Sequence, residues 1–410
     1  MRTLLFTVLV FVSTLACSQS LARFELNLSE PAGISTPVSI NLDELVPVTD
    51  SSFTLLEIQG EKTVPIAFQI RSGQPRILCW MINADDKHSS KRTYQLIRKR
   101  PGSFEQIRAE RKDGSLTVRT AGKNLLRYQF GTVYPPAGID TNFKRSGFIH
   151  PLWTPHGQPL TRIQAPDHYH HYGIWNPWTH VLFEKDTVDF WNLKEKKGTV
   201  RFARFTSVVE GPVYAEFEAL HEHVVFKKDG TEKTAINELQ TVRVYKPESN
   251  NDYYIVDIVS TMNCASASPV LLLTYRYGGL GWRATEFWND QNSEVLSSDG
   301  KTRKDADGSK ARWVIVQGQL NDDYGGAALL SDPSNYNHPE PLRIWPSGTN
   351  GRGDMFVNFS PTKDKDWLLE PGKSYVLKYR LLVFNGKFDP AKAENAWKNL
   401  AMPPVVKVIK

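Results

Sequence analysis

Hydrophobic and polar residues alternate along many segments of this chain, which predicts a protein built almost entirely of β-strands. The longest alternating segments cover residues 213–227, 234–245 and 253–262. Strands of this length suit a large antiparallel sandwich. Shorter alternating segments precede them and are typical of a smaller sheet: residues 37–42, 53–58, 64–70 and 76–82.

Turn residues divide these strands into two groups. Asp113-Gly114 joins two alternating segments and predicts a type I′ hairpin turn. We predict a small immunoglobulin-like β-sandwich over residues 23–118 and a large antiparallel β domain over residues 119–410. The fold class is therefore all-β.

One helix is expected close to the C-terminus. Asp389 can cap it, Pro390 can occupy its first position, and residues 391–400 are mostly good helix formers. Pro403 then ends the helical pattern.

The first 22 residues have the pattern of an export signal. Arg2 precedes an apolar run over residues 4–15, and Ala22 ends a small-x-small motif that suits cleavage. A competing lipoprotein-type site has Cys17 as the lipid-bearing residue. We therefore expect a periplasmic or secreted protein, with a lipid anchor at Cys17 as the alternative.

Composition limits the possible partners. The formal net charge is +6, but the basic residues are scattered in short pairs, so nucleic-acid binding is not expected. No segment after the signal is long and apolar enough to span a bilayer. Cys79 and Cys264 are far apart in sequence, and we expect two separate thiols rather than a disulfide.

The candidate chemistry is concentrated in residues 145–192, which hold six of the ten histidines and four of the eleven tryptophans. In an extended strand, His168 and His170 would share one face, where they could chelate a metal with a third ligand from elsewhere. Asp167 could instead orient a neutral histidine that acts as a general base. A hydrogen-bonded histidine cluster in a core or a domain joint is the remaining alternative.

Other polar residues could belong to the same pocket or to the protein surface. His150 lies in a rigid turn, and the candidates on later turns are Arg276, Tyr277, Arg283, Asn335 and His338. His221 and His223 form a second spaced pair, which we expect on a sheet face near the surface. Glu238 and Arg243 are expected to face solvent. No Walker, Rossmann or serine-hydrolase motif is present.

Several of these motifs together resemble an exported bacterial family labelled PmoA, a domain of unknown function, over about residues 120–385. The motifs are Gly147-Phe148-Ile149-His150-Pro151, Asp167-His168-x-His170-His171-x-Gly173-x-Trp175, Asp189-Phe190-Trp191, Gly278-Gly279-Leu280-Gly281-x-Arg283 and Asp332-Pro333-x-Asn335. The label refers to a subunit of a methane oxygenase, an integral membrane protein, whereas this chain has no predicted spanning segment. The resemblance implies a galactose mutarotase-like β-supersandwich and a sugar or uronate ligand.

We therefore expect an exported carbohydrate-active protein that performs lyase, epimerase or hydrolase chemistry on a sugar or oxidised sugar. The expected catalytic residues are His150, Asp167, His168, His170 and His171. His168 and His170 are also the candidate metal ligands, and a divalent metal ion is the candidate cofactor. The expected substrate-binding residues are Trp175, which would pack on the sugar ring, Arg276, Tyr277, Arg283, Asn335 and His338. The alternatives are a non-catalytic glycan-binding protein and a structural protein with a stabilising metal.

Overall fold

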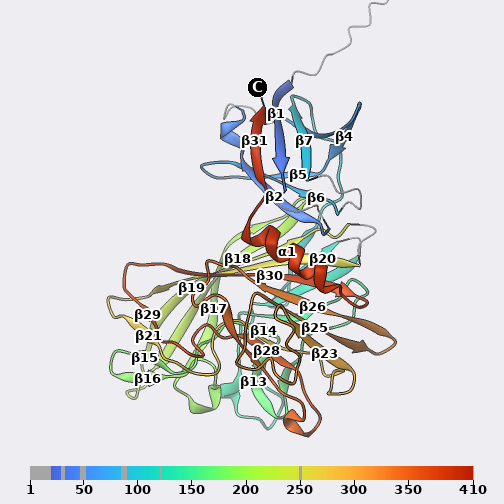
Figure 1. Cartoon of the computed structure of the whole chain (residues 1–410). Helices are drawn as coiled ribbons and strands as arrows, with labels where there is room; N and C mark the ends of the chain where they lie inside the picture. Colours follow the sequence, from blue (N-terminus) through green and yellow to red (C-terminus); the bar gives the residue numbers. More distant parts are fainter. Residues whose placement is uncertain are drawn as a thin grey trace, which may run out of the picture.

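The computed structural model describes residues 20–28, 33–46, 52–84, 90–120, 122–248 and 252–409. These residues form a small and a large group of sheets, with the helix α1 (Pro390–Ala401) lying between them (Figure 1). The predicted all-β fold with one C-terminal helix is confirmed for the described residues. The predicted signal peptide and Cys17 lie outside these residues, apart from residues 20–22, which begin the first strand.

The first sheet of the large sandwich has nine strands in the order β24-β27-β28-β22-β14-β11-β10-β9-β8. Asp113 and Gly114 join its last two strands with φ angles of 47° and 74°, as the predicted type I′ turn requires. The strands are β8 (Arg108–Lys112), β9 (Ser115–Thr120), β10 (Lys123–Gln129), β11 (Phe148–Leu152), β14 (Ile174–Trp175), β22 (Gly281–Arg283), β24 (Lys310–Ala311), β27 (Glu340–Ile344) and β28 (Phe356–Phe359).

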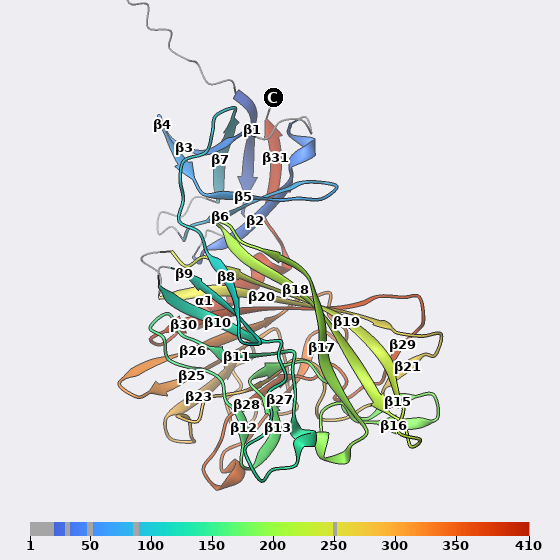
Figure 2. The ribbon, with the colours of Figure 1, turned by 180° about the vertical axis from the view of Figure 1, so that it is seen from behind.

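The second sheet has eight strands in the order β17-β18-β19-β20-β30-β26-β25-β23. Its long strands lie side by side across the back of the molecule (Figure 2). The strands are β17 (Gly198–Val209), β18 (Tyr214–Phe226), β19 (Glu232–Tyr245), β20 (Tyr253–Cys264), β23 (Ser293–Ser297), β25 (Trp313–Leu320), β26 (Asp323–Ser331) and β30 (Tyr375–Asn385).

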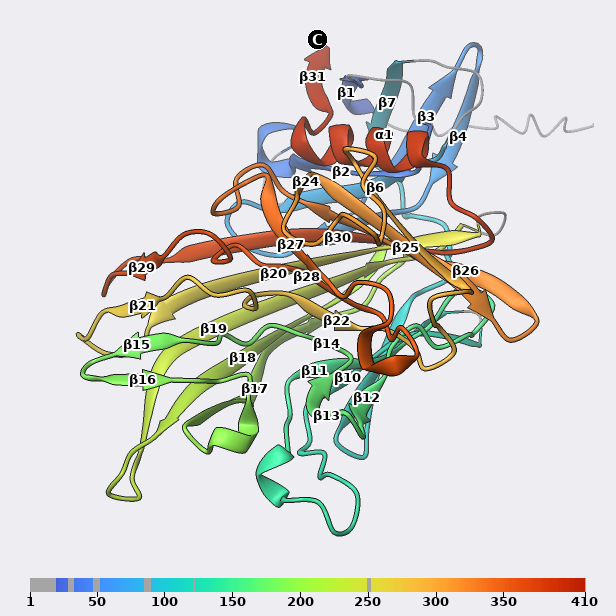
Figure 3. The same cartoon turned by 60° about the horizontal axis from the view of Figure 1, so that its bottom comes forward.

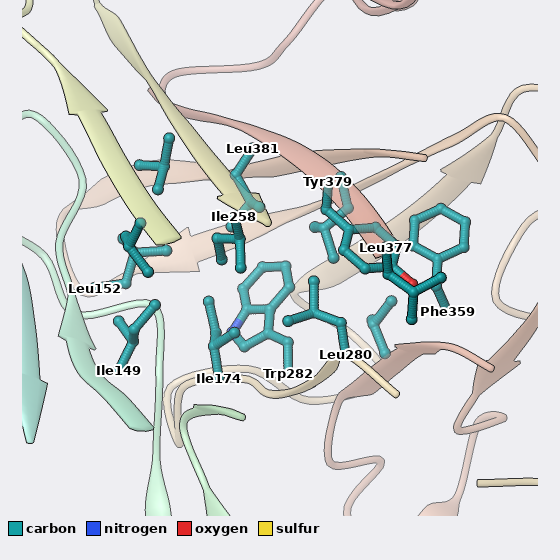
Figure 4. Packing of buried hydrophobic residues seen from close by; sticks show 14 of the residues in the cluster. Ile149, Leu152, Ile174, Ile258, Leu280, Trp282, Phe359, Leu377, Tyr379 and Leu381 are labelled. Carbon is teal, nitrogen blue, oxygen red and sulfur yellow. The ribbon is translucent and has the colours of Figure 1, made fainter. Parts of the chain in front are cut away.

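The main hydrophobic core lies between these two sheets. Ile149, Ile174 and Trp282 point from the first sheet toward Ile258 and Leu381 of the second (Figure 4). All five side chains are at most 3% exposed. Burying such apolar surface is the largest favourable contribution to folding, so this core fixes how the two sheets face each other.

The small sandwich contains a five-stranded sheet, β31-β1-β7-β3-β4, and a three-stranded sheet, β2-β6-β5. Its core includes Phe24, Trp80 and Tyr94. The last strand was not expected from the sequence: it leaves α1 and pairs with β1, with Phe24 opposite Val408. The strands are β1 (Ser20–Asn27), β2 (Thr36–Asn41), β3 (Thr54–Gln59), β4 (Lys62–Ile66), β5 (Phe68–Arg71), β6 (Ile77–Ile82), β7 (Lys91–Ile97) and β31 (Val405–Ile409).

The helix begins as the sequence predicted. The side chain of Asp389 accepts a hydrogen bond from the backbone N–H of Ala391, and Pro390 occupies the first turn. Ala393 and Ala396 are buried in a cluster that includes Phe384 and Phe388 of the large domain. None of the helices in the described ranges has the length and apolarity that crossing a membrane requires.

Two minor sheets and four short 3-10 turns complete the fold. One minor sheet covers the far ends of the long strands, and the other is a hairpin (Figure 3). Cys79 and Cys264 are free thiols, as expected. The elements are β15 (Val181–Phe183), β16 (Asp186–Val188), β21 (Val270–Leu272) and β29 (Trp367–Leu369); β12 (Ile163–Ala165) and β13 (His168–Tyr172); and η1 (Leu42–Glu44), η2 (Thr141–Phe143), η3 (Leu193–Glu195) and η4 (Thr349–Gly351).

Candidate functional site

The histidine-rich motif forms the β12–β13 hairpin, at the end of the molecule remote from the small sandwich (Figure 1, Figure 2). The two strands pair at only two positions, Ile163 with Tyr172 and Ala165 with His168, with a register shift between them. Because so little of β13 is held in a regular ladder, its side chains need not follow strict alternation.

Three histidine rings meet on this hairpin. The ring centroids lie 5.2 Å apart for His168 and His170, and 4.7 Å apart for His171 and each of the other two. One ring nitrogen from each residue lies within 4.8 Å of the others. In a regular strand His171 would face away from His168 and His170, but in this irregular strand all three rings lie together.

Asp167 holds the first of these rings. Its Oδ2 lies 2.7 Å from Nδ1 of His168, and an ionised carboxylate can only accept, so Nδ1 carries the proton and Nε2 is left free. Burial raises the pKa of the Asp167 carboxyl, but the hydrogen bond from His168 and the charge of Arg283 outweigh it and hold that pKa below its usual range. The predicted orienting role of Asp167 therefore has a geometric basis.

The other two histidines are neutral. Burial is the largest cause that lowers the pKa of His170 to about 3, and electrostatic interactions with His168, Arg145 and Arg283 lower it further. Burial also places the pKa of His171 well below its usual value. Nδ1 of His171 is buried without a hydrogen-bond partner. Neutral imidazole is the form that binds a metal ion.

Aromatic side chains form a floor beneath the three histidines. Trp175 and Phe356 each lie 5.2 Å from the ring of His171, and Trp345 lies 4.9 Å from the ring of His168. Trp175 is only 1% exposed. The expected packing of a sugar ring on Trp175 is therefore excluded in this structure, because His171 and Phe356 cover it.

Arg283 makes its contacts inside the protein rather than with a ligand. It is 1% exposed, and its Nη2 donates to the carboxylates of Asp167 and Asp354 at 3.0 and 2.7 Å. Its guanidinium carbon lies 4.5 Å from the ring centroid of Trp345. Arg283 therefore holds Asp167 in place and does not have the expected direct role in substrate binding. Its Nη1 is buried without a hydrogen-bond partner among the described residues.

Tyr277 and Arg276 lie beside the aromatic floor. The hydroxyl of Tyr277 accepts a hydrogen bond from Nε1 of Trp345 at 3.0 Å. Arg276 is exposed, and its guanidinium lies 5.4 Å from the ring of Tyr277. These two residues are therefore one aromatic layer removed from the histidines, at the edge of the same region.

His150 takes a different place from the one expected. It lies on β11, and its Nδ1 is 2.9 Å from the hydroxyl of Thr161. Burial lowers its pKa to about 4. Its described contacts do not include the three-histidine cluster, whose third member is His171, so the expectation that His150 belongs to the same pocket is not met.

Asn335 and His338 belong to another cluster, around the buried carboxyl of Glu340. Asn335 donates to Glu340 at 2.8 Å, and His338 lies 3.2 Å from the hydroxyl of Ser331. Burial raises the pKa of Glu340 to about 7. The expectation that Asn335 and His338 bind substrate in the histidine pocket is wrong, because they support the region under α1, where His338 stacks on Trp397.

The second histidine pair is also placed differently from the prediction. His221, His223 and Glu238 are fully buried between the two large sheets rather than near the surface. Nε2 of His223 lies 2.9 Å from Glu238, and Nε2 of His221 lies 2.6 Å from the hydroxyl of Tyr128. Asn176 and Ser260 donate to the remaining oxygen of Glu238. Arg243, also expected to face solvent, is mostly covered and bonded to Glu216.

Sequence reasoning missed three residues that build the histidine site: Trp345, Asp354 and Asn350. Asn350 donates a hydrogen bond to Asp167 from the η4 turn. These residues lie more than 170 positions after the hairpin, and no spacing rule connects segments so far apart. The glycine-rich sequence around Asn350 is the only local signal of a loop that approaches another part of the chain.

Two comparisons with known proteins bear on the chain. Residues 115–398 match the model of DUF6807, a protein family of unknown function. No curated protein matches the chain. The match agrees with the expectation of a domain of unknown function, whereas the likeness to the PmoA label and to galactose mutarotase stays a prediction.

Proposed function

We propose that this chain, which belongs to the DUF6807 family of unknown function, binds a divalent transition metal through His168, His170 and His171 and acts on a sugar or oxidised sugar. The observation that carries this proposal is the convergence of one ring nitrogen from each histidine within 4.8 Å. Three imidazoles are the protein ligands of a well-known class of catalytic zinc sites, which leave a fourth position for water or substrate.

The surroundings of the histidines favour a working site over a buried structural one. His168 and His170 are only partly buried, so a fourth position can face solvent. A bound metal supplies Lewis acidity and lowers the pKa of a coordinated water. Asp167 keeps the Nδ1 proton on His168, and the aromatic floor holds the ring of His171 in place. These contacts are the kind that orient metal ligands.

The carbohydrate part of the proposal is supported by the resemblance of the sequence motifs to the PmoA-labelled family and to galactose mutarotase-like proteins. The reaction class remains lyase, epimerase or hydrolase, in the periplasm or outside the cell. Arg276 and Tyr277 are suitably polar and close enough to the floor to contact a substrate that extends from the histidines.

A metal-free acid–base function is the second candidate, and the 2.7 Å contact between Asp167 and His168 favours it. A carboxylate-held neutral imidazole is a ready general base. A glycan-binding protein without catalysis would need an accessible aromatic surface, and the buried Trp175 does not supply one.

The test is an assay of the metal-loaded and chelator-treated protein on neutral sugars and uronic acids. We expect turnover only with metal, and its loss in His168→Ala without a change in melting temperature. His156→Ala is the matched control, because the side chain of His156 is exposed and contacts Asp323 rather than the three histidines. Turnover that survives chelation indicates the acid–base function instead. A melting temperature that collapses with chelator, without turnover under any condition, indicates a structural metal.

A further inference from the structure

Arg145 is a buried cation that touches no carboxylate among the residues that the structure describes. It is 3% exposed, and within the described residues its side chain donates one hydrogen bond, from Nη2 to the carbonyl of Phe190 at 2.6 Å. Its Nε is buried without a partner. Asp189 is the acidic group that acts on its charge, but that carboxylate already accepts from the N–H groups of Trp191 and Asn192.

Burying the guanidinium of Arg145 without a carboxylate partner destabilises the folded protein unless another anion pairs with it. A guanidinium keeps its charge in nearly all protein environments. Buried charges in folded proteins are paired, because removing them from water costs several kcal/mol per ion. One carbonyl oxygen is a weak substitute for a carboxylate, so the surroundings of Arg145 leave a place for an anion.

An open cavity of about 320 Å³ lies beside this arginine, which is one of its lining residues. Lys144 adds a second cation to the wall, and Ser146 and Thr199 add hydroxyl groups. Arg201 and Glu232 also line the cavity, but they are paired with each other at 2.8 Å. The lining therefore carries an excess of positive charge.

The hydroxyl group of Ser146 is available as a donor, whereas that of Thr199 donates to the carbonyl of Val200 at 3.5 Å. The oxygen of Ser146 accepts a hydrogen bond from the backbone N–H of Phe202 at 3.0 Å, which leaves its own O–H free to donate. In the described part of the chain, Lys144 approaches the ring of Tyr134, at 5.8 Å from its centroid, and no carboxylate. Cations and hydroxyls without an acidic partner are typical of sites that hold an oxyanion.

We propose that this cavity, the Arg145 cavity, binds a small oxyanion: a carboxylate, sulfate or phosphate group. Arg145 supplies the buried counter-charge, Lys144 a charge at the rim, and Ser146 a hydrogen bond. The volume is in the range of small-molecule sites, so the group can belong to an organic molecule such as an acidic sugar. The site is independent of the metal proposal, although Arg145 also lies 5.9 Å from the ring of Tyr172 at the end of the histidine strand.

The experiment is calorimetric titration of the mature full-length protein with sulfate, phosphate and glucuronate, each at constant ionic strength against chloride. We expect one equivalent of at least one anion to bind, and Arg145→Gln to weaken it by about tenfold or more. Arg119→Gln is the matched control, because Arg119 is exposed, paired with Glu110 and outside the cavity. Preference for glucuronate identifies an organic acid as the ligand, and preference for sulfate or phosphate an inorganic anion or its ester.

A second variant, Lys144→Ala, tests the proposal even if Arg145→Gln does not fold. This exposed change should keep the parental melting temperature and weaken binding by about threefold. The proposal is overturned if none of the three anions binds at millimolar concentration, or if a folded Arg145→Gln protein binds as tightly as the parent.

Discussion

The carboxylate of Asp167 connects the imidazole of His168 to the guanidinium of Arg283, with contacts of 2.7 and 3.0 Å. Arg283 is in turn held by Asp354 at 2.7 Å. The ring of His168 is therefore fixed by groups from three separate segments of the chain. Such support is what a ligand needs in order to bind a metal ion without first being ordered.

Replacing Asp167 should weaken metal binding while leaving the three histidines in place. We expect Asp167→Asn to lower the affinity by about 10- to 100-fold, because the amide no longer holds the Nδ1 proton of His168 as strongly. Competition with a chromophoric chelator measures the change. The control is Asp323→Asn, which breaks a similar contact to the exposed His156. Equal affinities for the two variants would contradict this role of Asp167.

His150 should make the stability of the protein depend on pH. Burial lowers its pKa from 6.5 to about 4, so as the pH falls through 6.5 the unfolded chain takes up a proton that the folded protein does not. This contribution to the free energy of unfolding is unchanged above pH 6.5 and declines between pH 6.5 and about 4.

Urea unfolding of His150→Gln and the parent across that range measures the effect. The variant should show a smaller loss of stability than the parent, relative to each protein's own value at neutral pH. His156→Gln serves as the exposed control and should follow the parent. If the free energy of unfolding of His150→Gln falls with pH as steeply as that of the parent, this histidine does not titrate as its burial requires.

The buried network between the sheets should be essential for stability. Glu238→Ala leaves the buried donors of His223, Asn176 and Ser260 without their acceptor, and we expect a loss of about 3–5 kcal/mol in the free energy of unfolding. Glu222→Ala, between the two histidines but half-exposed and paired with Arg201, should cost about 1 kcal/mol or less. Denaturant titration measures both, and a similar small loss for the two variants would contradict the account.

The last strand should stabilise the small sandwich specifically. Deleting residues 405–410 removes β31 and exposes the backbone of β1 at the edge of the five-stranded sheet. We expect an earlier, separate melting transition and faster proteolysis within residues 20–97, with the large sandwich unaffected. An unchanged melting curve would show that β31 adds little to this sheet.

Local sequence patterns predicted much of the fold. Alternation identified the long strands, the Asp113-Gly114 turn has the expected left-handed geometry, and Asp389 caps the only α-helix of the described residues. The strand after that helix was missed because five residues after a proline pair carry no periodicity of their own. Its partner β1 lies almost 400 residues earlier in the chain.

The candidate site was predicted only in part, because the sequence does not show which distant segments meet. The cluster of histidines was visible as a motif, and the structure brings His168, His170 and His171 together. The burial of Trp175 and the pairing of Arg283 with two carboxylates depend on how β22 and β28 pack against the hairpin. Asn335 and His338 were grouped with the site by chemistry alone, and the fold separates them.

The central claim is tested most directly by the metal content of the purified mature protein and of His171→Ala, measured by elemental mass spectrometry after dialysis against a divalent metal. The account predicts close to one transition-metal ion per chain for the parent and for His156→Ala, and far less for a His171→Ala protein that remains folded at the temperature of the measurement. A parent protein that retains no metal, or a His171→Ala protein that retains as much as the parent, would contradict it.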